Sequence, residues 1–118
     1  MNQVKWYIEK KAILIRLTSD IDIDELAKIN NQIVQLLVDG DSPVHVIYHS
    51  DDVSTPRDIS KVAKTLTFLR HDNCGWIISI GLDPVIKFVS RIVANLSHIN
   101  FKTVDSIEEV DDVLTKLG

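Results

Sequence analysis

The sequence predicts an α/β domain built around a mostly parallel sheet. Short apolar runs with the two-residue period of strands alternate with longer segments in which apolar residues recur every three or four positions. A helix between successive strands implies parallel pairing with right-handed crossovers. The chain has 118 residues, which suits one folding unit, so we expect residues 1–118 to form a single domain.

Two strands open the chain. Val4, Trp6 and Ile8 alternate with more polar residues, which is typical of a half-buried strand. Lys10 and Lys11 mark a turn, and the denser apolar run AILIRL at 12–17 predicts a strand nearer the centre of the sheet. We therefore expect an N-terminal antiparallel hairpin at one edge.

A helix and a buried strand come next. Apolar residues at helical spacing run through 22–39, Asp22 and Glu25 predict a capping box, and Gly40 is a suitable stop. The segment PVHVIYHS at 43–50 is apolar almost throughout, which predicts a strand covered on both faces.

The second half repeats this alternation. A second helix is predicted over 56–70, with Thr55 as its cap, Pro56 at its first position and Asp58 three residues after the cap. A strand at 75–81, a third helix at 84–100 after Asp83, a short strand at 101–104 and a final helix from 106 complete the chain. The predicted order is β-β-α-β-α-β-α-β-α.

Polar residues gather where three predicted strands end, and ligands bind at that edge of an open parallel sheet. They are Thr18, Ser19 and Asp20; then His49, Ser50, Asp51 and Asp52; then Asp83. Helix starts at Thr55 and Asp83 would add amide hydrogens that suit an anion. The same residue types also cap helices and make turns, and we favour capping and solvation as their role.

Motifs for metals and for catalysis are missing from the sequence. His49 with Asp20, Asp51, Asp52 and Asp83 would offer oxygen-rich ligands for magnesium or manganese. However, no HExxH, paired CxxC, acidic calcium loop, GxSxG or phosphate-binding loop is present. We therefore expect no metal, no cofactor and no enzymatic activity.

Composition excludes several other classes. The net charge is −4 and no basic run is interleaved with aromatics, so nucleic acid is not an expected partner. Cys74 is the single cysteine, which rules out an intrachain disulfide and suits a reducing compartment. No apolar run approaches the ~20 residues that span a bilayer, and the N-terminus has no apolar signal core. These features predict a cytoplasmic protein without membrane insertion.

Three segments together resemble a STAS domain, and more closely the SpoIIAA-like group of anti-sigma-factor-antagonist-like proteins. They are AILIRLTSDIDIDELAKI, VHVIYHSDDVSTPRDISKV and FKTVDSIEEVDDVLTKL. The resemblance covers nearly the whole chain. It implies a bacterial, non-enzymatic regulatory module that acts by binding a protein partner.

The family's switch motif is Asp-Ser-Ser-Gly, in which the first serine is phosphorylated. The best match here is Asp58-Ile59-Ser60, followed by Lys61, so an isoleucine stands at the phosphoserine position. A shifted alignment brings Ser54 or Thr55 near the helix start. The resemblance thus implies a degenerate switch, with Ser54, Thr55 and Ser60 as the possible phosphorylation sites.

The leading hypothesis is therefore an interaction module whose contact surface is the loop after the third strand and the start of the second helix. Its residues are His49, Ser50, Asp51, Asp52, Ser54, Thr55, Asp58 and Ser60. The alternative is a small-molecule binder that holds an apolar, anionic or lipid-like ligand between sheet and helices, because the SpoIIAA-like group is related in shape to lipid-binding SEC14-type domains. A second copy of the chain is a further candidate partner, since the edge strand VKWYIE needs covering.

Overall fold

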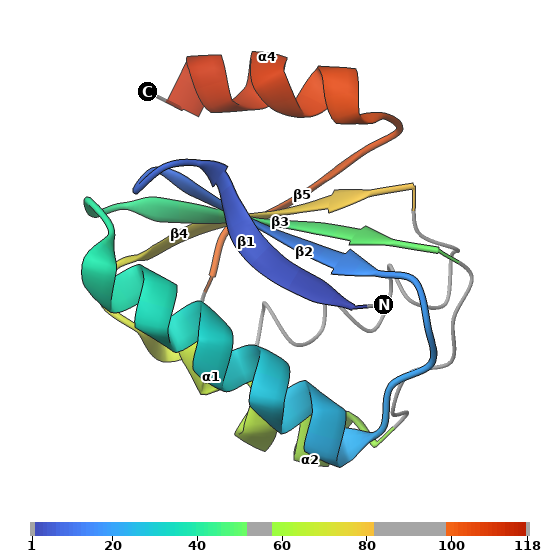
Figure 1. Cartoon of the computed structure of the whole chain (residues 1–118). Coiled ribbons are helices and arrows are strands. Elements are labelled where there is room, and N and C mark those ends of the chain that lie inside the picture. The colour runs from blue at the N-terminus through green and yellow to red at the C-terminus, as the bar shows by residue number, and fades with distance from the viewer. Residues whose placement is uncertain (1, 52–57, 82–98, 118) are drawn as a thin grey trace.

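The computed structural model describes residues 2–51, 58–81 and 99–117. Five strands form one sheet in the order β1-β2-β3-β4-β5 (Figure 1). They are β1 (Gln3–Ile8), β2 (Ala12–Leu17), β3 (Val44–Ser50), β4 (Cys74–Ile80) and β5 (Phe101–Val104). β1 pairs antiparallel with β2 and the other neighbours pair parallel. The predicted fold class, with its N-terminal antiparallel hairpin, is confirmed.

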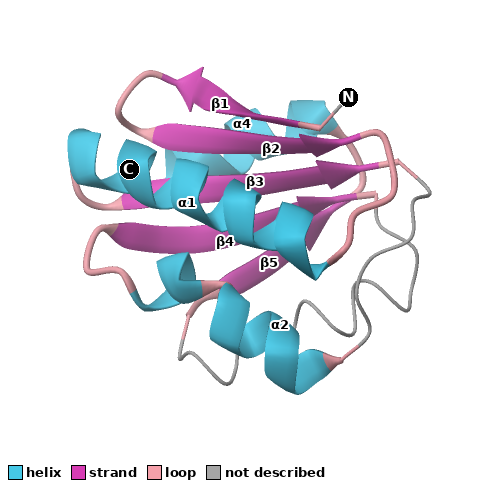
Figure 2. Ribbon diagram, turned by 60° about the horizontal axis from the view of Figure 1, so that its bottom comes forward, coloured by secondary structure: helices cyan, strands magenta, loops and turns pink. Residues whose placement is uncertain are grey.

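Helices cover both faces of the sheet. α1 (Ile23–Asp39) and α2 (Ile59–Thr65) lie on one face, and α4 (Ile107–Leu117) lies on the other (Figure 2). Alternating side chains of β3 reach two separate buried clusters: Val44 and Val46 pack in the cluster with α1, whereas Ile47 packs in the cluster with α4. This is why the run at 43–50 is apolar at almost every position.

The N-cap expected at Asp22 and the stop expected at Gly40 are both confirmed. The Asp22 side chain accepts a hydrogen bond from the Glu25 amide at 2.8 Å. At the other end, a Cβ on Gly40 would lie 2.6 Å from Val44 Cγ2 and 2.9 Å from the Trp6 ring. Glycine at this stop therefore lets α1 close tightly onto the hairpin.

The second helix differs from the prediction at both ends. It begins at Ile59, with Asp58 as its N-cap accepting from the Lys61 amide at 3.1 Å, so Asp58 holds the cap position assigned to Thr55. It ends at Thr65, and residues 67–70 form a separate 3-10 helix, η1 (Thr67–Arg70). Thr55 itself lies outside the described residues.

A buried side chain from α1 explains the break between α2 and η1. Asn30 is only 4% exposed. Its amide nitrogen donates to Thr67 Oγ1 at 2.8 Å, and its oxygen accepts from the Phe68 amide at 2.9 Å. The backbone thus finds its partner on another helix instead of continuing its own.

The predicted third helix, 84–100, falls mostly outside the described residues. Within the ranges that the structure describes, no helix combines the length and apolar character needed to cross a membrane.

Candidate functional site

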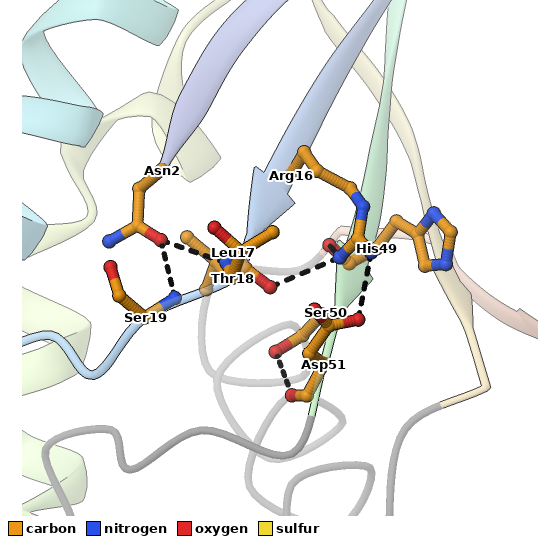
Figure 3. Close-up of polar contacts among 8 residues, drawn as sticks. All are labelled: Asn2, Arg16, Leu17, Thr18, Ser19, His49, Ser50 and Asp51. Atoms are coloured by element: carbon orange, nitrogen blue, oxygen red, sulfur yellow. Dashed lines mark hydrogen bonds and ion pairs between the residues drawn. The ribbon is translucent and has the colours of Figure 1, made fainter.

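Arg16 organises the carboxyl ends of β2 and β3. It stands opposite His49 in the parallel register. Its Nη1 donates to the carbonyl oxygens of Leu17 at 3.1 Å and His49 at 3.3 Å, and its Nη2 donates to Asp51 Oδ1 at 2.7 Å (Figure 3). One guanidinium therefore joins two strand ends and the first residue beyond β3.

The turn after β2 is held by backbone amides. Asn2 Oδ1 accepts from the amides of Thr18 at 3.0 Å and Ser19 at 3.1 Å, and the Asp51 amide donates to the Leu17 carbonyl at 2.8 Å (Figure 3). These bonds satisfy backbone groups that would otherwise face only water at the sheet edge. The contacts of Thr18 and Ser19 through their amides agree with the turn role that the sequence favours.

Tyr48 and Ser50 lie on the α1 side of β3. Burial raises the pKa of the Tyr48 phenol to about 12, although its hydrogen bond with Ser50 acts to lower it. The Ser50 hydroxyl donates to the Asp51 carbonyl at 2.7 Å, and Ser50 is only 8% exposed. Ser50 is therefore part of the packed end of the strand rather than a surface contact.

His49 lies at the end of β3, where its surroundings favour the neutral imidazole. Burial lowers its pKa most, the Arg16 charge lowers it further, and Asp51 acts in the opposite direction. Its ring extends away from Arg16 and Asp51 (Figure 3). Neutral histidine offers one hydrogen-bond donor and one acceptor, so His49 suits a polar contact more than a charge pair.

The remaining predicted site residues divide into two groups. Asp20 and Ser60 are exposed, and so is the N-cap Asp58. No hydrogen bond or ion pair joins Asp58 or Ser60 to Arg16, His49 or Asp51. The other group, Asp52, Ser54, Thr55 and Asp83, lies outside the described residues. The structure thus brings together the ends of β2 and β3, but leaves the third predicted contributor undescribed.

Over 2–51, 58–81 and 99–117, no three His, Cys, Asp or Glu side chains gather closely enough to hold a metal ion. His49 and Asp51 reach the same strand ends, but Arg16 occupies the space beside Asp51 with its own positive charge. A cation at Asp51 would have to compete with that guanidinium.

Sequence reasoning missed Arg16 and Asn2. The signal for Arg16 was available, because a charged residue inside the apolar run AILIRL needs a partner when the strand is central. Asn2 has no comparable signal. Its role depends on the hairpin returning the N-terminus to the turn after β2.

Comparison with known proteins supports the fold. No family model matches the sequence, and no curated protein matches it. A solved structure of the anti-sigma factor antagonist SpoIIAA in its unphosphorylated form is similar, with a TM-score of 0.64 and 19% identity over 96% of this chain and 97% of that one. The chain has the SpoIIAA-like STAS fold. A structure of the Bacillus cell fate determinant SpoIIAA in the phosphorylated form is also similar, with a TM-score of 0.58 and 13% identity over 96% of this chain and 99% of that one.

Proposed function

We propose that this SpoIIAA-like domain is a non-enzymatic regulatory module that binds a protein partner at the carboxyl ends of β2 and β3. The observation that carries the proposal is the Arg16 arrangement, which fixes the chain as it leaves β3. A surface that is rigid before binding loses less entropy when a partner docks. The fold it shares with an anti-sigma factor antagonist supports the same role.

The described part of this surface offers polar contacts of both signs. Asp51 is about half exposed as a side chain, Asp58 and Ser60 are exposed, and Lys61 and Lys64 follow on α2. Mixed charge of this kind favours specificity and correct orientation of a partner more than raw affinity. His49 adds a polar group at the end of β3.

Site-specific photo-crosslinking tests the proposal. A photoreactive amino acid at position 51 or 60 is compared with the same amino acid at position 41. Position 41 is exposed and lies just before β3, at the end of the strand opposite to position 51. We expect one protein from the source cells to be captured from positions 51 and 60 and not from position 41. Equal capture from all three positions, or none from 51 and 60, contradicts the proposed surface.

Phosphorylation is a second element of the proposal. Ser60 is exposed at the second position of α2. A phosphate there would add about two negative charges near the helix N-terminus, one turn before Lys64 and close to the Asp58 cap. Ser54 and Thr55 remain candidates outside the described residues.

Intact-mass measurement after incubation with cell extract and ATP tests this switch. We expect one added phosphoryl group on the wild type and none on the variant that lacks the acceptor, with Ser54→Ala, Thr55→Ala and Ser60→Ala as the matched set. An unchanged wild-type mass removes the switch and leaves the interaction surface.

The proposed module acts in the cytoplasm of a bacterium, and a second copy of the chain is a candidate partner. β1 is an edge strand, with β2 as its hydrogen-bonded neighbour in the described sheet. Light scattering coupled to size exclusion distinguishes a dimer from a monomer. A monomer at the highest attainable concentration excludes pairing through β1.

The competing function, a ligand held between sheet and helices, meets a packed core where the structure describes that region. Ile13, Ile33, Leu37 and Val46 are all fully buried in the cluster under α1. Native mass spectrometry of gently purified protein tests the competing function, which loses its support if only the mass of the chain itself is found.

A further inference from the structure

A pocket of about 340 Å³ lies at the amino ends of β3 and β4. The proposed partner surface lies at the carboxyl ends of the strands, so the two are at opposite ends of β3. The described lining of the pocket comes from the starts of β3 and β4, from the two residues before β5 and from the end of α4. It includes His45, Gly75, Trp76, Ile99, Asn100 and Leu117. The volume is at the lower end of the roughly 300–1,000 Å³ range of small-molecule sites.

A β-bulge builds one wall of this pocket. Val44 pairs with Cys74 but Val46 pairs with Ile77, so His45 alone faces both Gly75 and Trp76. The extra residue of a bulge leaves a backbone group without its partner in the ladder. His45 Nδ1 accepts that hydrogen bond from the Trp76 amide at 3.0 Å.

Gly75 makes room for the imidazole. A Cβ at this position would lie 2.6 Å from His45 Nδ1 and 2.9 Å from its Cε1. The ring therefore occupies the space of an absent side chain, and its position is set by close contact as well as by the hydrogen bond to Trp76.

The other ring nitrogen of His45 presents a donor. Because Nδ1 accepts from an N–H group, the single proton of the neutral ring sits on Nε2. His45 is only 8% exposed, and its side chain lines the pocket. Its Nε2 is not one of the fully buried polar atoms left without a partner among the described residues, so the donor is open to whatever fills the pocket.

We propose that this pocket binds a small neutral molecule that carries a hydrogen-bond acceptor on an apolar body. The acceptor would take the bond from His45 Nε2, and the apolar body would lie against Trp76, Ile99 and Leu117. The described lining carries no formally charged side chain, which disfavours an ionic ligand because nothing there would compensate its charge. The Asn100 side chain, which makes no hydrogen bond to the described residues, adds a second polar contact at the rim.

The proposal is independent of the partner-binding function, because the two sites occupy opposite ends of β3. Benzamide is the probe, since it joins a carbonyl acceptor to an apolar ring. Benzamidinium is the matched control, since it has nearly the same shape but no acceptor and carries a charge. Both are titrated into the ¹⁵N-labelled full chain, and amide shifts are followed by NMR.

We expect saturable benzamide shifts at His45, Gly75 and Trp76, with benzamidinium binding about five- to tenfold more weakly, as the loss of one hydrogen bond implies. His45→Phe keeps a ring but removes the donor, and it should weaken benzamide by a similar factor. That variant also removes the hydrogen-bond acceptor of the Trp76 amide. Leu117→Trp therefore provides a second test, because the larger side chain on α4 would fill the pocket. Lys116→Ala, an exposed neighbour outside the lining, should bind as the wild type does.

Three results would each overturn the proposal. They are the absence of saturable benzamide shifts in the wild type, equal binding of benzamide and benzamidinium, and unchanged binding in a folded Leu117→Trp variant.

Discussion

Gly75→Ala tests whether the bulge between β3 and β4 is built around the His45 ring. The new Cβ would lie 2.6 Å from His45 Nδ1, whereas ordinary contact begins at 3.4 Å. The ring must retreat by the difference, about 0.8 Å, or the backbone of β4 must move. Either shift stretches the 3.0 Å bond from the Trp76 amide to Nδ1 beyond hydrogen-bond range.

Three effects set the magnitude. An unpaired buried amide costs about 1–3 kcal/mol. Forcing an extra methyl group into a packed site costs about 1–3 kcal/mol. Replacing glycine lowers the entropy of the unfolded chain, which returns about 0.4–1 kcal/mol. We expect a net loss of about 3 kcal/mol in the free energy of unfolding, or a melting temperature lower by about 12 °C for a domain of this size.

Urea unfolding of a double-mutant cycle provides the assay. In a His45→Ala background the ring is gone, and the nearest remaining contact of the new Cβ is Pro43 Cβ at 3.2 Å. Gly75→Ala should then change the free energy of unfolding by no more than about 0.5 kcal/mol. If it costs the same in both backgrounds, the ring is not what excludes a side chain at position 75 and this reasoning fails.

Further predictions concern α1, the thiol and pH. Asn30→Ala should lower the free energy of unfolding in urea by about 2–3 kcal/mol and speed hydrogen exchange at the Phe68 amide. Asn31→Ala, at an exposed position on the same helix, should leave the free energy of unfolding unchanged. Equal losses in the two variants would show that Asn30 does not anchor η1. Burial raises the pKa of the Cys74 thiol from 9.0 to about 12, so its thiolate fraction at a given pH falls about a thousandfold. Thiol reagents should therefore label Cys74 only when the chain unfolds. Rapid labelling of the native chain would contradict this. Burial lowers the pKa of His45 below 6.5, so the unfolded chain binds more protons than the folded chain as the pH falls below 6.5. The stability that the neutral ring contributes should be fully present above pH 6.5. It should be lost as the pH drops through the lowered pKa. His45→Gln should flatten that fall in thermal melts, and an unchanged slope would assign it to other groups.

Local patterns predicted most of the architecture because strands and helices here have clean periods. The alternation at Val4 and Trp6 and the apolar run at 43–50 each reflect how many faces a strand buries. Ile8 departs from this pattern because the register shifts between Trp6 and Ile8, which leaves Ile8 44% exposed. The break between α2 and η1 was beyond such patterns. Residues 59–70 read as one helix, and only Asn30, almost forty positions earlier, supplies the partner that ends it.

The start of α2 shows a different difficulty. Thr55-Pro56 and Asp58 are both good helix-start signals, and local sequence does not rank them. At the strand ends, the polar loop residues were visible but the side chain that organises them was not. Arg16 sits within an apolar strand, and its three acceptors come from Leu17, His49 and Asp51, so its role depends on the β2–β3 register.

The strand order of the sheet bears on how the chain folds during synthesis. Each strand pairs with the strands next to it in the chain, so every new strand can add to the growing edge as it leaves the ribosome. α1 and α2 emerge early and can cover their face at once. The cluster on the other face, which includes Ile47 and Ile78, is completed by α4, the last of the described elements in the chain. We therefore expect this cluster to form after the one under α1, once all five strands and α4 have left the ribosome.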